Sequence, residues 1–216
     1  EGEDIDVSGE VSPDGRYISY TDWRTGDLAI YEISTGKKRR LTSPTEVEPF
    51  GMVLRSRWSS DSQRIAYNWY NKDSFWDLRI IGLDGPKHRV LYRDKDVFPL
   101  PLDWSPDGKH ILAIFDNYYK DKVKQVGLIS VTDGAVSILE TFKGRAAYYY
   151  LCFSPDGRYI AYDYPQKQGS QDRDIFIYSI EEKSEIPLVQ DLADDRLVVW
   201  TPDGKNILFG SNRLGT

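Results

Sequence analysis

The 216-residue chain is poor in the side chains that most often carry metal, redox or nucleophilic chemistry. It contains one cysteine, Cys152, and two histidines, His88 and His110. A single cysteine excludes an intrachain disulfide, and one cysteine with two histidines supplies no zinc ligand set. Cys152 is most simply a small buried residue, and each histidine falls at the start of an expected strand. We therefore expect no metal site and no cofactor.

Sequence patterns that define several other classes of protein are also absent. No apolar run approaches the about twenty residues that a membrane-spanning helix needs. No G-x-S-x-G nucleophile motif, phosphate-binding loop or dinucleotide fingerprint occurs. The formal net charge of −6 argues against a general surface for nucleic acid or anionic membranes, although a local basic patch is compatible with it. The chain is therefore expected to be no enzyme, to bind no nucleic acid and to insert into no membrane.

The chain is rich instead in aromatic residues, 13% of the total, and several of them belong to a repeated stretch. The stretch Trp-Ser-Pro-Asp-Gly at residues 104–108 has near copies at 11–15, 58–62, 153–157 and 200–204. The central residues of the copies, at positions 13, 60, 106, 155 and 202, are 46 to 49 residues apart. Repetition at this period is typical of repeat folds. In the second copy Ser60 and Ser62 replace proline and glycine, so a looser turn is expected there.

Each copy lies between two short runs rich in β-branched and aromatic residues, which indicates strand, turn and strand. An isoleucine follows the central residue by five positions in every copy, at Ile18, Ile65, Ile111, Ile160 and Ile207. A third run ends eleven residues before a leucine in the first four repeats, at Leu41, Leu91, Leu139 and Leu188. The constant step predicts a hairpin between a third and a fourth strand. Each repeat is therefore expected to be a four-stranded antiparallel sheet.

The combined pattern W-S-P-D-G-[RK]-x-I, D-x-x-I-Y and R-x-L-T resembles the TolB-like, WD-related β-propeller repeat. That repeat also occurs in the propeller domains of prolyl-oligopeptidase-type serine peptidases. The resemblance covers nearly all of residues 5–216 and implies an all-β propeller of four-stranded antiparallel blades. Residues 1–216 then form a single propeller domain or fragment, with blades at about 5–43, 52–94, 97–142, 146–190 and 195–216.

The fifth repeat reaches only its second strand at the end of the sequence. The chain is thus expected to hold four full blades and about half of a fifth, as an incomplete or open propeller. Three explanations stay open for this arrangement, and a fragment of a larger propeller is the favoured one. The second is an open arc, alone or with its edge completed by a strand of another chain. The third is closure by residues 2–7, which would have to replace two strands and also begin blade one.

An aspartate recurs in every copy of the turn, at Asp14, Asp61, Asp107, Asp156 and Asp203. A ring of calcium ligands is one interpretation. Turn formation is the favoured one, because aspartate at such positions accepts hydrogen bonds from the turn backbone. Residues that differ between repeats are therefore better candidates for a binding site than residues that recur.

Two positions of the first strand vary from repeat to repeat, and the first strands of propellers of this type line the central channel. The charged and aromatic residues at these positions are Glu10, Arg55, Arg57, Asp103 and Tyr150. They are predicted to form a polar channel mouth that binds a ligand or partner. The alternative is that the charges pair with one another or face water in the channel.

The loops between the second and third strands vary in length, which is typical of an exposed, function-bearing rim. Aromatic residues on or beside these loops form a second candidate site: Trp69, Tyr70, Phe75, Tyr118 and Tyr119. Aromatic side chains among charges are common anchors for protein or peptide partners.

The sequence therefore predicts a non-catalytic propeller that binds protein or peptide partners. One alternative is the propeller portion of an oligopeptidase-like serine hydrolase, which a G-x-S-x-G motif in the parent gene would identify. Another is a propeller that binds a glycan or a small ligand through its rim aromatics. The resemblance is compatible with a periplasmic protein or with part of a larger cytoplasmic or membrane-anchored regulator, so the compartment stays open.

Overall fold

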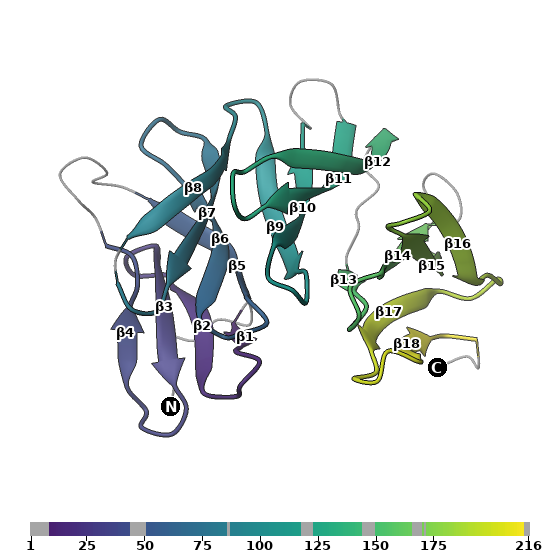
Figure 1. Cartoon of the computed structure of the whole chain (residues 1–216), viewed down its shortest axis with the longest axis horizontal. Coiled ribbons are helices and arrows are strands. Elements are labelled where there is room, and N and C mark those ends of the chain that lie inside the picture. The colour runs from purple at the N-terminus through teal and green to yellow at the C-terminus, as the bar shows by residue number, and fades with distance from the viewer. Residues whose placement is uncertain are drawn as a thin grey trace. The chain divides into compact units, whose positions relative to one another are not determined.

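A computed structural model describes residues 9–43, 51–85, 87–117, 123–143, 150–165, 170 and 172–213 (Figure 1). These residues form strands, turns and loops, and none of them belongs to a helix that could cross a membrane. The chain forms two compact units, residues 1–141 and 142–216, and each is described by itself.

The first unit contains three four-stranded antiparallel sheets, blades one to three, each with its strands side by side in chain order. Blade one holds β1 (Glu10–Val11), β2 (Tyr17–Asp22), β3 (Asp27–Glu32) and β4 (Lys38–Arg40). Blade two holds β5 (Met52–Trp58), β6 (Arg64–Tyr70), β7 (Trp76–Gly82) and β8 (His88–Arg93). Blade three holds β9 (Phe98–Trp104), β10 (His110–Asp116), β11 (Val123–Ser130) and β12 (Val136–Lys143).

The second unit contains one complete blade and one two-stranded sheet. The complete blade holds β13 (Leu151–Phe153), β14 (Tyr159–Pro165), β15 (Arg173–Ser179) and β16 (Ser184–Val189). The two-stranded sheet holds β17 (Asp195–Trp200) and β18 (Ile207–Ser211). The predicted all-β fold, with four four-stranded antiparallel sheets and part of a fifth, is confirmed.

The recurring turn between the first and second strands is built by its serine and aspartate side chains. In the third copy the Ser105 hydroxyl donates to Asp107 Oδ1 (2.7 Å), and the same oxygen accepts the N–H of Lys109 (3.0 Å). Gly108 has a φ of +67°, which glycine adopts without a steric cost. Equivalent side-chain bonds form in the other four copies, so each turn aspartate serves the turn itself.

The second copy forms the same turn without proline or glycine, and the expected loosening is not observed. Ser62 adopts a φ of +58°, and its N–H donates to the Ser59 carbonyl at 2.9 Å, against 2.8 Å for the equivalent bond from Gly108. The Ser62 hydroxyl also accepts the N–H of Asp14 in the preceding blade (3.0 Å). This bond between blades offsets the cost of left-handed backbone at a residue other than glycine.

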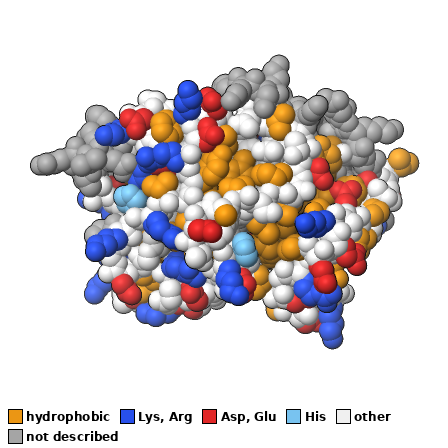
Figure 2. Space-filling model, turned by 45° about the horizontal axis from the view of Figure 1, so that its top comes forward, with side chains coloured by type: hydrophobic (Ala, Val, Ile, Leu, Met, Phe, Trp, Pro, Cys, Tyr) orange, Lys and Arg blue, Asp and Glu red, His pale blue; other side chains and the backbone are white. Residues whose placement is uncertain are grey.

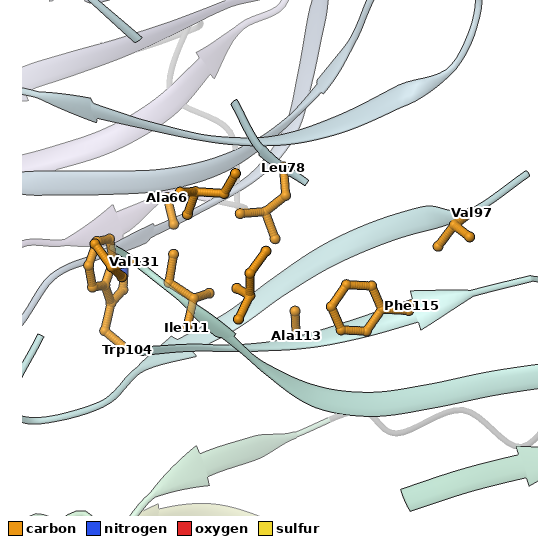
Figure 3. Packing of buried hydrophobic residues seen from close by; sticks show 10 residues of the cluster. Ala66, Leu78, Val97, Trp104, Ile111, Ala113, Phe115 and Val131 are labelled. Carbon is orange, nitrogen blue, oxygen red and sulfur yellow. The ribbon is translucent and has the colours of Figure 1, made fainter. Parts of the chain in front are cut away.

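The hydrophobic core of the first unit lies between neighbouring blades, because each blade has two apolar faces. The second strands β6 and β10 are buried on both faces, and Ile65, Ala66, Ile111 and Leu112 all have 0% of their surface exposed. Figure 3 shows one layer of this core, in which Ala66 and Leu78 of blade two pack with Ile111 of blade three. Apolar area buried in this way is the main favourable contribution to folding.

Anchor tryptophans join blades two and three to the blade before each of them. Trp58 Nε1 donates to the carbonyl of Glu10 (3.0 Å), and Trp104 Nε1 donates to the carbonyl of Arg57 (2.9 Å). In both cases the acceptor directly precedes the anchor position of the earlier blade. Trp200 stands at the same position in the second unit, but its buried indole N–H has no hydrogen-bond partner among the described residues.

Replacing an anchor tryptophan by phenylalanine should therefore reveal the contribution of the indole hydrogen bond. We expect Trp58→Phe and Trp104→Phe to lower the free energy of unfolding by about 1 kcal/mol more than Trp200→Phe does, since only the first two lose a hydrogen bond. Trp200→Phe is the control because it removes the same atoms without that bond. Urea denaturation followed by circular dichroism measures the difference, and equal losses for the three variants would contradict the expected role of the bond.

Candidate functional site

The first strands of the three blades in the first unit lie next to one another. β5 contacts both β1 and β9, so residues on these strands come together although they are about one repeat apart in the sequence. Four of the five residues predicted for the channel mouth lie here: Glu10 on β1, Arg55 and Arg57 on β5, and Asp103 on β9. We call these four residues the inner cluster.

β-bulges in two of these strands change the direction of the backbone at the inner cluster. In β5, Leu54 and Arg55 both lie opposite Asn68, whose Oδ1 accepts their N–H groups at 3.2 and 2.9 Å. In β9, Leu102 has no residue opposite it on β10, and its carbonyl accepts Nε–H of Arg57 (2.5 Å). Each bulge thus releases backbone groups from the ladder, and Arg57 takes one of them.

The carboxylate of Glu10 connects two blades. Glu10 Oε2 accepts the backbone N–H of Trp58 (2.9 Å), and Oε1 lies 3.7 Å from Nε of Arg57. Burial raises the pKa of the Glu10 carboxyl above its ordinary value, against the lowering effect of Arg57; Asp103 raises it further and Arg55 lowers it. Glu10 therefore interacts with the other three charged groups, and the cluster holds two acids and two bases.

Glu10 and Arg57 thus form a charge pair within the inner cluster. Such pairing is the alternative to ligand binding that the sequence left open for these residues. The side chains of Glu10 and Arg57 nevertheless remain 32% and 21% exposed, so solvent reaches both of them. Tyr150, the fifth predicted residue, belongs to the second unit, where its side chain is 56% exposed next to β13.

The predicted aromatic rim divides into buried and exposed members. Trp69 is only 3% exposed and packs in the core between blades one and two, so it offers no surface to a partner. Its burial follows from strand parity, because Ile65 and Tyr67 point to the same face of β6. Tyr70 is 37% exposed and lies on the opposite face. Tyr118 and Tyr119 fall outside the described residues.

An aromatic group extends from Tyr70 across to blade three. The Tyr70 ring lies 5.2 Å from Trp76, and Trp76 meets Phe98 edge to face at 5.1 Å, measured between ring centroids. Phe75 is close by in sequence, and its ring lies 5.9 Å from the guanidinium carbon of Arg93. The group lies where β5 and β9 begin, since Met52 pairs with Tyr70 and β9 starts at Phe98. It is therefore at the other end of these strands from Arg57 and Asp103.

A buried charge cluster beside this aromatic group was missed by the sequence analysis. Asp77 and Arg79 are 0% and 1% exposed, and Asp77 Oδ2 accepts hydrogen bonds at 2.7 Å from both Arg79 and Arg93. Burial tends to raise the pKa of Asp77, but the bonds from Arg93 and Arg79 outweigh it, so the pKa is below its ordinary value. Asn71 Nδ2 donates to the same carboxylate (3.0 Å), which fixes the loop that carries Phe75.

One signal in the sequence points to this cluster. An aspartate is the first or second residue of the third strand in blades one, two and four. The residue two positions later is apolar at Ala29 and Phe176 but charged at Arg79. No group of three or more histidine, cysteine, aspartate or glutamate side chains in the described part of the chain has the arrangement of a metal site.

The raised pKa of Glu10 predicts a specific dependence of stability on pH. The Glu10 carboxyl binds its proton more tightly in the folded state than in the unfolded state. Its contribution to the free energy of unfolding is therefore fully present below pH 4.5, the ordinary pKa, and is lost as the pH rises through the folded pKa. We therefore expect the stability of the wild type relative to Glu10→Gln to fall as the pH rises from 4 toward 7.

Asp14 supplies a control of opposite sign for this titration. The Ser12 hydroxyl and the Arg16 N–H lower the pKa of Asp14, so its contribution is present above pH 3.8 and is lost as the pH falls through the folded pKa. The stability of the wild type relative to Asp14→Asn should accordingly fall at low pH. Chemical denaturation across the pH range measures both differences, and a common sign would contradict the environment described for Glu10.

No family model matches the chain, and no curated protein matches its sequence. Solved structures do match it. A putative TolB from Agrobacterium tumefaciens is 18% identical with a TM-score of 0.69, over 94% of this chain and 68% of that one. TolB from Acinetobacter baumannii is 20% identical with a TM-score of 0.65, over 92% of this chain and 47% of that one.

The tricorn protease is 20% identical with a TM-score of 0.69, and the match covers 95% of this chain but 19% of the protease. The chain thus spans between about a fifth and about two thirds of the length of these three proteins. At such low identity the likeness concerns the fold. The fold of this chain is that of the TolB-like β-propellers, as its repeat predicts.

Proposed function

We propose that the chain is a non-catalytic propeller module that binds a protein or peptide partner through the inner cluster. The observation that carries the proposal is the convergence of Glu10, Arg55, Arg57 and Asp103 from three consecutive blades. These positions differ between repeats, so the repeat itself does not require their charges. Glu10 and Arg57 also bind backbone groups of neighbouring blades, and all four side chains stay partly exposed, so a ligand can reach them.

The balance of charge favours a peptide over a polyanion. Two acids and two bases within one cluster complement a ligand that carries both signs, as a peptide does with its side chains and backbone dipoles. A nucleic acid needs a surface of one sign, and Figure 2 shows acidic and basic side chains interspersed on the face that it presents. The formal net charge of −6 supports the same conclusion.

The exposed part of the aromatic rim is a second contact surface under this proposal. Tyr70 is held by Trp76, and Trp76 by Phe98, so the exposed ring needs little further ordering to receive a partner. Aromatic side chains that are fixed before binding make efficient anchors.

A second candidate is the propeller portion of a larger peptidase. The likeness to the tricorn protease, which covers 19% of that protein, favours it. In this case the inner cluster would contact a peptide substrate on its way to a separate catalytic domain. The two candidates share a peptide ligand, and a G-x-S-x-G motif in the parent reading frame would select the second.

An array of immobilised random peptides, probed with the labelled chain, tests the proposal. We expect the double variant Arg55→Ala and Arg57→Ala to bind the peptides selected by the wild type at least tenfold more weakly, because both cations of the inner cluster are lost. The control is Arg16→Ala with Arg24→Ala, which removes the same charge from exposed positions of blade one.

The control variant should retain wild-type binding, and both variants should keep the circular dichroism spectrum of the wild type. Equal binding by all three proteins would remove the inner cluster from recognition. The absence of any selected peptide would overturn the proposed function.

A further inference from the structure

The fourth strand of each complete blade is the outer edge of its sheet, where backbone N–H and C=O groups face outward. Such edges pair readily with strands of other chains unless charge, proline or a short length prevents it. The four outer strands of this chain, β4, β8, β12 and β16, can therefore be compared with one another.

Three of the four outer strands carry protection. β4 has three residues and all of them are basic, Lys38 to Arg40. β8 carries Arg89 and Arg93, and Arg89 donates to the carbonyls of Val131 and Thr132 in the next blade. β16 contains Pro187, which cannot donate to an added strand, beside Glu185.

β12 lacks these features. It has eight residues, against three, six and six for the other outer strands, and Glu140 is the one charged residue between Val136 and Phe142. Val136 and Ile138 are 38% and 42% exposed. Ser137 occupies the position that corresponds to Arg89, two residues before the recurring leucine, and it carries no charge.

One backbone N–H group of β12 is bonded to a side chain of the same strand. The N–H of Thr141 donates to the carboxylate of its own neighbour Glu140 (2.9 Å) and so does not depend on another strand. Both residues are exposed, and an exposed side chain can rotate away at small cost. An incoming carbonyl can then replace the carboxylate as acceptor.

We propose that residues 136–141 of β12 accept an extended segment of a partner protein as an added antiparallel strand of blade three. The backbone groups of the edge supply the hydrogen bonds, as in other cases of strand addition. Apolar or β-branched side chains of the segment pack beside Val136 and Ile138, and a lysine or arginine pairs with Glu140. This surface lies on the outer strand of its blade, whereas the inner cluster lies on the innermost strands, so the two proposals stand independently.

A second copy of the chain is a poorer occupant than a foreign segment. If two copies of β12 paired antiparallel over all eight residues, Glu140 of one would lie opposite Leu139 of the other. If the pairing were centred on Glu140, two carboxylates would lie opposite each other, which is destabilising. A foreign segment with a basic residue at this point avoids both arrangements.

A synthetic peptide complementary to the edge tests the proposal with the full chain. The probe has the sequence Thr-Lys-Thr-Val-Thr-Val, with blocked ends and a fluorescent label, so that its lysine meets Glu140 when its strand runs antiparallel to residues 136–141. We expect saturable binding by fluorescence anisotropy and slower amide hydrogen exchange within β12. A peptide with glutamate in place of the lysine should bind at least fivefold more weakly.

Matched variants locate the binding. Ile138→Lys and Val136→Lys place a charge on the proposed edge and should each weaken binding at least tenfold. Val90→Lys makes the same change at a residue of β8 that is 37% exposed, and should change the affinity less than twofold. Because all three side chains are partly exposed, thermal unfolding of the variants should match that of the wild type.

Four results would overturn the proposal. They are no binding of the peptide at its solubility limit, equal affinity of the glutamate peptide, equal losses for Ile138→Lys and Val90→Lys, and self-association. The last would appear in sedimentation as a wild-type dimer that Ile138→Lys dissociates, and would assign the edge to a second copy.

Discussion

Each blade is a sheet with two apolar faces, and the need to bury both of them is the constraint on which the rest of the structure depends. A single sheet cannot satisfy it. The second strand β6 is covered by blade one on one face and by blade three on the other. The anchor tryptophans and the side chain of Ser62 then add polar bonds between the same blades. The first strands are brought together as a result, and the inner cluster forms from residues about 47 positions apart.

Features governed by short stretches of sequence could be predicted. The turn at Ser105 to Gly108 encodes its own hydrogen bonds and left-handed residue, so its copies located the blades and their strands. The isoleucine at position 65 or 111 is buried because strand alternation and turn position together fix which face it occupies. Four residues of the inner cluster were found in the same way, as departures from a pattern.

Features that depend on two strands at once could not be predicted. The bulge at Leu54 and Arg55 arises from pairing with β6, and the sequence of β5 alone does not reveal it. Arg79 looks like a surface residue until the carboxylate of Asp77 and the ring of Trp69 are seen around it. Trp69 was assigned to the rim because it lies near a loop, although strand parity places it in the core.

The indole bonds of the anchor tryptophans run in one direction along the chain, from the later blade to the earlier one. In a linear array, stability is approximately a sum of terms for single repeats and terms for adjacent pairs. One position per repeat therefore contributes to the pair term. Tryptophan at 58 and 104, and phenylalanine at 153, show that this position is not kept constant. Within the first unit, the coupling of blades two and three to the blade before each of them thus includes a single indole N–H bond, which Trp200 of the second unit does not make among the described residues.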